Sequence, residues 1–435
     1  MTVKIYVEGY GCTLNSADTT IIENSIKEFK DFQIIDKDED ADIVVINTCI
    51  VRLETEHKMI SRIKYLRSLN KKVVVAGCMA KALREKLEGI SDILIMPKEA
   101  HLSGKMLHNL FNERIEKEII PKDRNKNKIG KIGIDSNNLN DKLKYLKPSK
   151  NSIIVPLPIC EGCVGKCSYC IVKVARGRLI SYDREFIVKK ADELIKNGAK
   201  CLLVTAQDTA CYGFDRNDNL PNLINDLCSI EGKFGMRIGM MHAKNALEIL
   251  DELVESYKND KVTKFLHLPI QSGDDGVLKD MKREYTVDEF ISVISEFRRK
   301  IKNLNFTTDV IVGFPTETEE AFENTLEILK KLKPDYTHGA KYTQRKYTEA
   351  ARLKQVDTKI RKRRSEILNE LRRELSYENN KKHIGEKFEI LVTGKNEGIT
   401  ENCKPVKFNE DAEIGTFRTI KITEAKTFGL FGELK

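Results

Sequence analysis

The chain has 435 residues, and at roughly 150 residues per domain this length predicts about three domains. With 40% hydrophobic and 32% charged residues, the composition is that of a globular protein and excludes a disordered or fibrous chain. No apolar run approaches the roughly 18 residues of a membrane helix, and the start of the chain lacks a signal-peptide pattern. We therefore expect a cytoplasmic protein with no membrane partner.

Residues 1–115 alternate Val- and Ile-rich strand patterns with helical patterns. The predicted strands are Val3–Val7, Asp42–Asn47, Lys72–Ala76 and Ile93–Met96. This order predicts an α/β domain with a parallel sheet covered by helices. The polar, turn-forming stretch over residues 116–150 has no apolar periodicity and is predicted to be a linker.

Six further strand patterns alternate with helical patterns up to about residue 345. The predicted strands are Ile153–Pro158, Cys201–Ala206, Met236–Met241, Phe265–Gln271, Phe306–Val312 and Tyr336–Tyr342. They predict a full or partial (β/α) barrel with ligands at the carboxyl ends of its strands, and we assign residues 151–375 to this domain. Residues 376–435 contain strand patterns punctuated by glycine and predict a small all-β domain.

Three of the eleven cysteines form a compact motif. Cys163, Cys167 and Cys170 follow the spacing C-x3-C-x2-C, which fits three corners of a [4Fe–4S] cluster and leaves the fourth iron open. The alternative is a structural zinc ion, which normally has four protein ligands. No histidine is near enough in sequence to complete such a site, although Cys160 could do so.

Three more cysteines share a topological position in the N-terminal domain. Cys12, Cys49 and Cys78 each follow the carboxyl end of a predicted parallel strand, and in such a sheet these ends line one crevice. We predict a second three-cysteine cluster there, against the alternative of three unrelated buried thiols. The histidines are scattered, so no catalytic residue beyond the two clusters is predicted. His242 and His267, at barrel strand ends, are read as core or rim residues.

A basic stretch precedes the β domain. Between Lys341 and Lys382 there are 14 basic and 6 acidic residues, a local charge of +8. Such a run is either the solvated face of a helix or a surface that binds nucleic acid. Its densest part is the sequence Arg361, Lys362, Arg363 and Arg364.

Taken together, these motifs resemble the methylthiotransferase family of radical S-adenosylmethionine enzymes over essentially the whole chain. The sequence Cys170–Leu179 resembles the archaeal and eukaryotic branch, which modifies N6-threonylcarbamoyladenosine beside the tRNA anticodon. The resemblance implies a partial (β/α)6 radical S-adenosylmethionine barrel and a C-terminal TRAM-like RNA-binding domain. The resemblance also implies cofactor-binding residues inside the cysteine motif and at two barrel strand ends. These residues are Tyr169 in the motif and Gln271, Ser272, Gly273, Asp309 and Gly313 at the strand ends.

The resemblance further implies two [4Fe–4S] clusters, S-adenosylmethionine, a tRNA partner and a reducing electron donor. One cluster would generate the 5′-deoxyadenosyl radical that attacks C2 of the adenine, and the other would present the sulfur. The basic helix and the β domain would then hold tRNA phosphates. Arg361, Lys362, Arg363 and Arg364 are consecutive and fan around a helix, so only two or three of them should touch RNA. Alternatively, the protein could be a methylthiotransferase that acts on another tRNA adenosine or on a ribosomal-protein side chain. An alternative of another class is a non-enzymatic protein that binds zinc and RNA.

Overall fold

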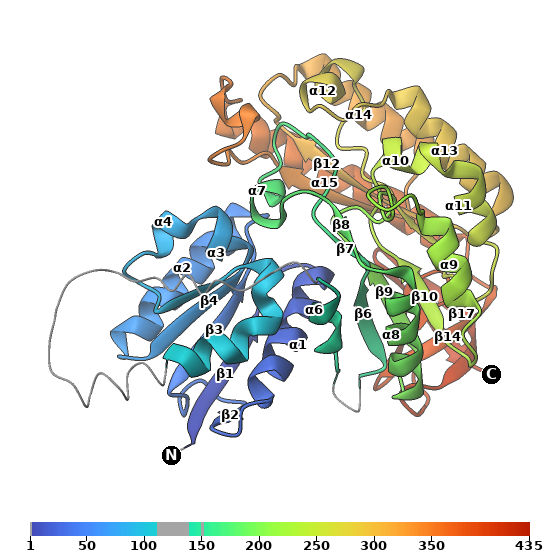
Figure 1. The fold of residues 1–435 in the computed structure, drawn as a ribbon. Coiled ribbons are helices and arrows are strands. Elements are labelled where there is room, and N and C mark those ends of the chain that lie inside the picture. The colour runs from blue at the N-terminus through green and yellow to red at the C-terminus, as the bar shows by residue number, and fades with distance from the viewer. Residues whose placement is uncertain (1, 111–138, 149–151) are drawn as a thin grey trace, which may run out of the picture. The chain divides into compact units, whose positions relative to one another are not determined.

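A computed structural model describes residues 2–110, 139–148 and 152–435. Its first sheet has five parallel strands in the order β2-β1-β3-β4-β5 (Figure 1). The strands are β1 (Val3–Gly9), β2 (Phe32–Ile34), β3 (Ile43–Thr48), β4 (Lys72–Gly77) and β5 (Ile93–Ile95). The four predicted strands are confirmed, and the short edge strand β2 is additional.

Helices cover both faces of this sheet. The helices are α1 (Thr13–Lys27), α2 (Leu53–Ser68), α3 (Cys78–Ala82), α4 (Arg84–Leu87) and the 3-10 helix η1 (Pro97–Leu102). Met59 and Ile63 of α2 pack with Val44 and Val75 on one face, and α1 buries Ile21 against the other. Residues of β3 are therefore buried on both sides, which explains the nearly continuous Val and Ile of that segment.

Segments from further along the chain complete this first compact unit. It contains residues 1–149, 156–163 and 171–190. The added elements are α6 (Asn140–Lys144), β7 (Cys160–Glu161), α7 (Val172–Arg176) and β8 (Ile180–Ser181). The predicted linker lies outside the described residues over 111–138. In its later part, residues 140–144 form the short helix α6. Leu143 of this helix and Leu146 just after it are fully buried, so this part of the predicted linker packs against the domain.

The second unit contains residues 150–155, 164–170 and 191–435 and is built on parallel strands. The strands form two three-stranded sheets, with the orders β10-β9-β6 and β11-β12-β13. Just after β10, Met241 N–H donates to the carbonyl of His267 at the end of β11 and so connects the two sheets. The strands are β6 (Ile154–Pro158), β9 (Cys201–Thr205), β10 (Gly235–Ile238), β11 (Phe265–His267), β12 (Asn305–Val312) and β13 (Tyr336–Lys341). The six predicted barrel strands are confirmed.

Helices alternate with these strands, as predicted. They are α8 (Arg184–Lys196), α9 (Leu220–Cys228), α10 (Ala243–Glu248), α11 (Leu250–Ser256), α12 (Asp275–Asp280), α13 (Val287–Lys300) and α14 (Glu319–Leu332). Strand β11 is shorter than predicted and ends at His267. Pro269 has no N–H to donate, which interrupts the ladder. Gln271, with a positive φ of 69°, returns to β12 only as an isolated bridge to Val310.

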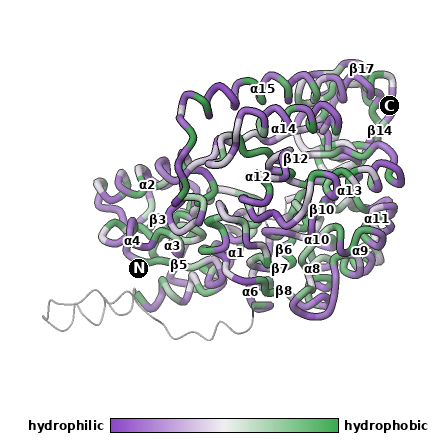
Figure 2. The backbone as a smooth tube through the Cα atoms, turned by 90° about the horizontal axis from the view of Figure 1, so that it is seen from above, coloured by the Kyte–Doolittle hydropathy of each residue, from purple (hydrophilic) through white to green (hydrophobic). Residues whose placement is uncertain are grey.

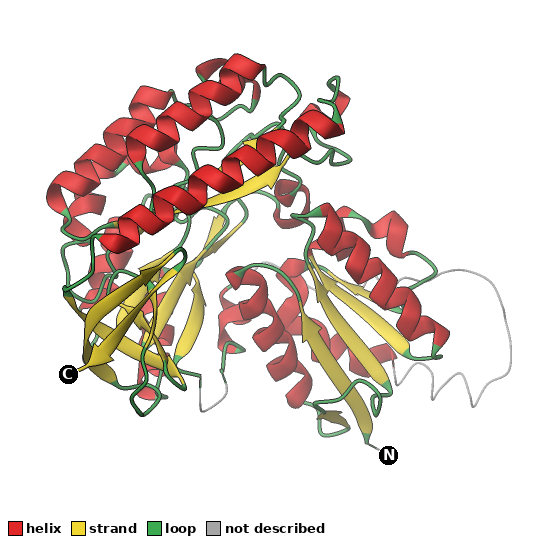
Figure 3. Cartoon of the chain, turned by 180° about the vertical axis from the view of Figure 1, so that it is seen from behind, coloured by secondary structure: helices red, strands yellow, loops and turns green. Residues whose placement is uncertain are grey.

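The C-terminal residues form a closed five-stranded barrel with the order β14-β15-β16-β18-β17. Its strands are β14 (Lys387–Gly394), β15 (Glu397–Thr400), β16 (Pro405–Lys407), β17 (Phe417–Lys426) and β18 (Gly429–Leu434). The short 3-10 helix η2 (Glu349–Arg352) and the long helix α15 (Thr358–Lys381) precede it, and Figure 3 shows α15 ending beside these strands.

The small barrel contacts the amino ends of the larger barrel's strands. Asn305 Nδ2 donates to the Asn402 carbonyl over 2.8 Å, and Lys404 Nζ pairs with Asp335 over 2.7 Å. The C-terminal domain therefore covers the end of the barrel opposite to the carboxyl ends at which ligands bind.

Candidate active site

The three cysteines of the N-terminal sheet follow neighbouring strands. Cys12 comes after β1, Cys49 after β3 and Cys78 after β4, and these three strands are adjacent in the sheet. Gly11, with φ +116°, must be glycine here because a Cβ would lie only 3.0 Å from Cys49 Sγ. The structure thus brings these cysteines to one edge, as the sequence predicted.

The exposure of these thiols differs. Cys12 is exposed, whereas Cys49 and Cys78 are buried. Burial raises the pKa of Cys78 to about 11, the guanidinium of Arg176 opposes this rise, and the Cys12 thiol adds to it. Within the described residues no three cysteine sulfurs lie within 4.8 Å of one another.

Arg176 connects Cys78 to a buried ionic network. Its Nε lies 3.4 Å from Cys78 Sγ, its Nη1 3.0 Å from Glu161 and its Nη2 2.7 Å from Asp18. Lys142 pairs with both carboxylates, and all four charged side chains are at most 1% exposed. Burial raises the pKa of Glu161, but Lys142 and Arg176 outweigh it and lower the value to about 2. Two cations therefore balance two carboxylates behind Cys78.

The second cysteine motif is anchored by backbone and hydroxyl contacts. In the first unit, Cys163 N–H donates to the Gly177 carbonyl over 3.3 Å. In the second unit, Cys170 N–H donates to the Cys167 carbonyl over 3.2 Å, and Ser168 Oγ donates to the Asp280 carbonyl over 2.7 Å. Between its first and second cysteines, the motif passes from one compact unit to the other.

Arg283 places a buried guanidinium beside Cys167 Sγ, as Arg176 does beside Cys78 Sγ. Its Nη1 lies 3.4 Å from Cys167 Sγ and 3.5 Å from the hydroxyl of Tyr169. The same guanidinium donates from Nη2 to the Pro269 carbonyl, and Tyr285 donates to the Ile270 carbonyl over 2.8 Å. Arg283 thus ties the cysteine motif to the segment that follows β11. Sequence reasoning missed both arginines, since neither has a diagnostic spacing.

The predicted cofactor-binding residues at the strand ends divide into two groups. Ser272, Gly273 and Gly313 are used in packing: Gly273 N–H donates to Thr325, and a Cβ on Gly313 would lie 2.2 Å from Arg361 Cγ. Gln271 and Asp309 keep polar groups available for a ligand. Gln271 is 91% buried, and its Oε1 has no hydrogen-bond partner among the described residues.

Two further polar residues lie at the ends of β9 and β10. Asp208 accepts hydrogen bonds from the His242 N–H and from Asn245 Nδ2. Burial raises the pKa of Asp208 to about 6 and lowers the pKa of His242 to about 2. His242 is therefore a neutral, buried rim residue, as the sequence suggested, and Asp208 was missed.

The basic run on α15 is only partly available to RNA. Figure 2 shows α15 as mainly hydrophilic (purple) with hydrophobic (green) residues between, and Leu368, Leu371 and Leu375 are buried at helical spacing. Arg364 is 4% exposed at its side chain and pairs with Glu317 over 2.6 Å and Glu319 over 3.0 Å. The assignment of Arg364 to RNA binding is therefore corrected, because a buried, doubly paired guanidinium cannot reach a phosphate. Lys362 and Arg363 face solvent, and Arg361 donates to the Tyr342 carbonyl.

Comparison with known proteins decides the family. Residues 157–329 match the model of the Radical SAM superfamily, and residues 4–96 match a model described as "Uncharacterized protein family UPF0004". A protein of Methanocaldococcus jannaschii named "Probable threonylcarbamoyladenosine tRNA methylthiotransferase" is 62% identical over 100% of this chain and 97% of its own length. The chain belongs to the methylthiotransferase family of radical S-adenosylmethionine enzymes.

More distant matches agree with this membership. A Fusobacterium nucleatum protein named "tRNA-2-methylthio-N(6)-dimethylallyladenosine synthase" is 30% identical over 99% of both chains. The structure of the radical S-adenosylmethionine methyltransferase TsrM from Kitasatospora setae matches with a TM-score of 0.58, 12% identity, and 81% and 75% coverage of this chain and its own. That likeness concerns the fold alone. As a member of this family, the methylthiotransferase uses S-adenosylmethionine and a [4Fe–4S] cluster. None of its described helices is long and apolar enough to cross a membrane.

Proposed function

We propose that this methylthiotransferase converts N6-threonylcarbamoyladenosine beside the tRNA anticodon into its 2-methylthio derivative. The observation that carries the proposal is the 62% identity, over the full chain, with the relative named for that reaction. The relative named for dimethylallyladenosine is only 30% identical, which favours the threonylcarbamoyl substrate over another tRNA adenosine. Its source of electrons would be a separate reducing partner.

We further propose that the chain holds two [4Fe–4S] clusters, one on Cys12, Cys49 and Cys78 and one on Cys163, Cys167 and Cys170. Support for the first comes from their shared sheet edge, the glycine at position 11 and the arginine behind Cys78. Support for the second comes from its spacing and from the arginine that reaches Cys167. When bound, the clusters supply radical generation from S-adenosylmethionine and the sulfur to be transferred.

The protein's own side chains would position these groups and exclude water. Arg176 and Arg283 place buried positive charge beside cysteine ligands, where anionic sulfur requires compensation. Tyr169 packs edge-on against Phe314 and would shield one side of the cofactor. The base itself can enter because anticodon-loop nucleotides are unpaired and can be turned outward.

The deciding experiment is nucleoside mass spectrometry of total tRNA from cells that lack this protein. We expect loss of 2-methylthio-N6-threonylcarbamoyladenosine with accumulation of its unmethylthiolated precursor, and restoration by the wild-type gene but not by Cys12→Ala. An unchanged tRNA profile together with a modified aspartyl side chain on a ribosomal protein would replace this proposal by the protein-substrate alternative. Membership of a transferase family disfavours the non-enzymatic zinc protein.

A further inference from the structure

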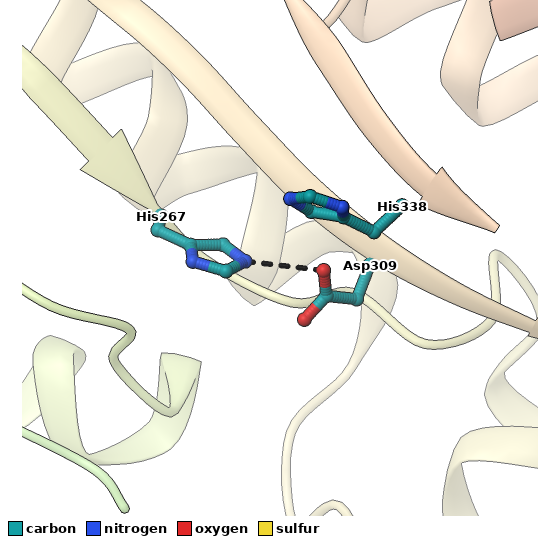
Figure 4. Close-up of side chains that lie close together, drawn as sticks. All are labelled: His267, Asp309 and His338. Carbon is teal, nitrogen blue, oxygen red and sulfur yellow. Dashed lines mark hydrogen bonds and ion pairs between the residues drawn. The ribbon is translucent and has the colours of Figure 1, made fainter. Parts of the chain in front are cut away.

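Three side chains with metal-binding atoms meet on three neighbouring barrel strands. They are His267 of β11, Asp309 of β12 and His338 of β13, and one ligand atom from each lies within 4.8 Å of the others (Figure 4). His267 Nε2 is 3.1 Å from Asp309 Oδ1, and the two imidazole ring centroids are 5.6 Å apart. Over the described ranges 2–110, 139–148 and 152–435, no other group of His, Cys, Asp and Glu meets this spacing.

The strand register holds these three residues on one face of the sheet. His267 pairs with Thr307 and Asp309 pairs with His338, while Thr307 and Asp309 are two residues apart on β12. Partners in a parallel pair, and residues two apart, share a face. The opposite face packs against helices, since Phe306 contacts Phe290 of α13. The three ligands therefore face the inside of the barrel from a rigid scaffold.

Two imidazoles and one carboxylate form a typical set of ligands for a divalent first-row metal. Such a set leaves several coordination positions open for a substrate. The simpler interpretation is a His267–Asp309 hydrogen bond that only orients the imidazole. That interpretation needs two residues and does not explain why His338 brings a second imidazole to the same point. The side chains of His267 and Asp309 are 21% and 26% exposed, so a ligand can reach them.

The group lies close to the expected position of the substrate. Ile311, two residues beyond Asp309, packs against the apolar cluster that contains Phe314, and Tyr169 of the cysteine motif packs against the same cluster. Two residues of a strand span about 7 Å, so the group lies about one layer deeper in the barrel than this contact. On the neighbouring segment, Gln271 N–H donates to the Asp309 carbonyl, and Oε1 of the same Gln271 is buried without a partner. The unsatisfied oxygen is a second sign that a ligand binds here.

We propose that His267, Asp309 and His338 bind one divalent cation, and that this cation binds the carboxylate of the N6-threonylcarbamoyl group of the substrate. The second part rests on the proposed function. With neutral imidazoles and an ionised Asp309, the three ligands carry a charge of −1, and a divalent cation changes it to +1. A substrate carboxylate, which Asp309 alone would repel, then neutralises the site. A dimethylallyl substituent has no anionic group and would gain nothing from the cation.

The first test measures zinc binding to the intact protein. Anaerobically prepared protein with its clusters is dialysed against Zn2+, and zinc and iron are measured in the same samples. We expect about one zinc per chain in the wild type and at least tenfold weaker binding in His338→Ala and Asp309→Asn, at unchanged iron content. Replacement of the exposed His57 on α2 by Ala is the matched control and should bind like wild type. Equal zinc binding by wild type and His338→Ala, or none by the wild type, would overturn the proposal.

The second test asks whether the cation recognises the carboxylate. Binding of an anticodon stem-loop that carries N6-threonylcarbamoyladenosine is compared, with and without Zn2+, to that of the same stem-loop with unmodified adenosine. Zinc should strengthen only the former, at least tenfold, and not in His338→Ala. An equal effect on both RNAs would overturn the carboxylate assignment. Zinc binding needs no RNA, so failure of the proposed function, seen as an unchanged cellular tRNA profile, is distinguishable from failure here.

Discussion

Arg176 and Arg283 each place a guanidinium 3.4 Å from a cysteine sulfur that we assign as an iron ligand. Both are at least 95% buried, and both carry further hydrogen bonds that fix their orientation. In a medium of low dielectric, such a donor stabilises an anionic sulfur more strongly than an exposed arginine would. The packing that buries these two arginines therefore also determines how strongly the neighbouring cysteine sulfurs are stabilised as anions.

Replacement of Arg176 by Ala should remove both the donor to Cys78 and one cation from the network with Asp18 and Glu161. A buried carboxylate that loses its partner costs about 3–5 kcal/mol. We expect a lower thermal midpoint and loss of about half of the reconstituted iron, with S-adenosylmethionine cleavage retained. Arg178→Ala, an exposed arginine two residues away, is the control. Full iron content in Arg176→Ala would contradict the role given to Arg176.

The partly buried imidazole of His101 on η1 predicts a specific pH dependence. Burial, and then the charge of Lys142, lower its pKa to about 4. Between about pH 6.5 and 4 the unfolded chain binds a proton that the folded chain does not, so stability falls as the pH falls through this range, by up to about 3 kcal/mol. His101→Gln should therefore lose less thermal stability than wild type between pH 7 and 5. The exposed His57→Gln should follow wild type, and identical curves for all three proteins would contradict the prediction.

At the scale of elements, α15 combines a structural and a surface role. Arg361 and Arg364 point to the barrel, where Arg364 joins Glu317 and Glu319 at the start of α14. Lys362 and Arg363 lie on the solvent side of the same turn. Four consecutive residues on a helix are spread around its axis, so one basic run necessarily serves both purposes.

The two sides of α15 should respond differently to substitution. Lys362→Ala with Arg363→Ala should weaken tRNA binding and reduce the slope of log affinity against log salt by about 0.7 to 0.9 per lost phosphate contact, with an unchanged melting temperature. Arg364→Ala should instead lower the melting temperature, because Glu317 is left buried without its cation. tRNA titrations at several salt concentrations measure the first effect. A slope equal to that of wild type would transfer tRNA binding to the C-terminal barrel, residues 385–435.

For the whole molecule, the two cysteine sets predict two separable functions. Anaerobically reconstituted protein should hold about eight irons, from two four-iron clusters. Replacing Cys163, Cys167 and Cys170 by Ala should remove about half of the iron and abolish cleavage of S-adenosylmethionine. Replacing Cys12, Cys49 and Cys78 should remove the other half and abolish methylthiolation, while 5′-deoxyadenosine is still formed. Cys228→Ala, outside both sets, is the control. Stoichiometric zinc without sulfide in protein purified without oxygen would exclude the two-cluster assignment.

Much of this architecture follows from local pattern. We predicted the parallel sheet, the six barrel strands and the small β domain from apolar segments bounded by turn-forming residues. Parallel strands that are buried on both faces consist largely of Val and Ile, which makes them visible in the sequence. The shared position of Cys12, Cys49 and Cys78 also follows, since chain order and parallel connection together place those three residues at one sheet edge.

The buried charges could not be predicted in this way, because each partner lies far away in the chain. Arg176 pairs with Asp18, which is 158 residues earlier in the chain, and with Glu161, which is 15 residues earlier. No rule of sequence spacing predicts either of these ion pairs. The same holds for His267, Asp309 and His338, which only the register of three strands brings together. Within α15, helical spacing predicts that two or three of the four cations are available to RNA, but only packing against Glu317 shows that Arg364 is removed from solvent. Local sequence thus determined the elements and the positions of the two cysteine sets, whereas long-range packing decided which charges are buried and which can meet a ligand.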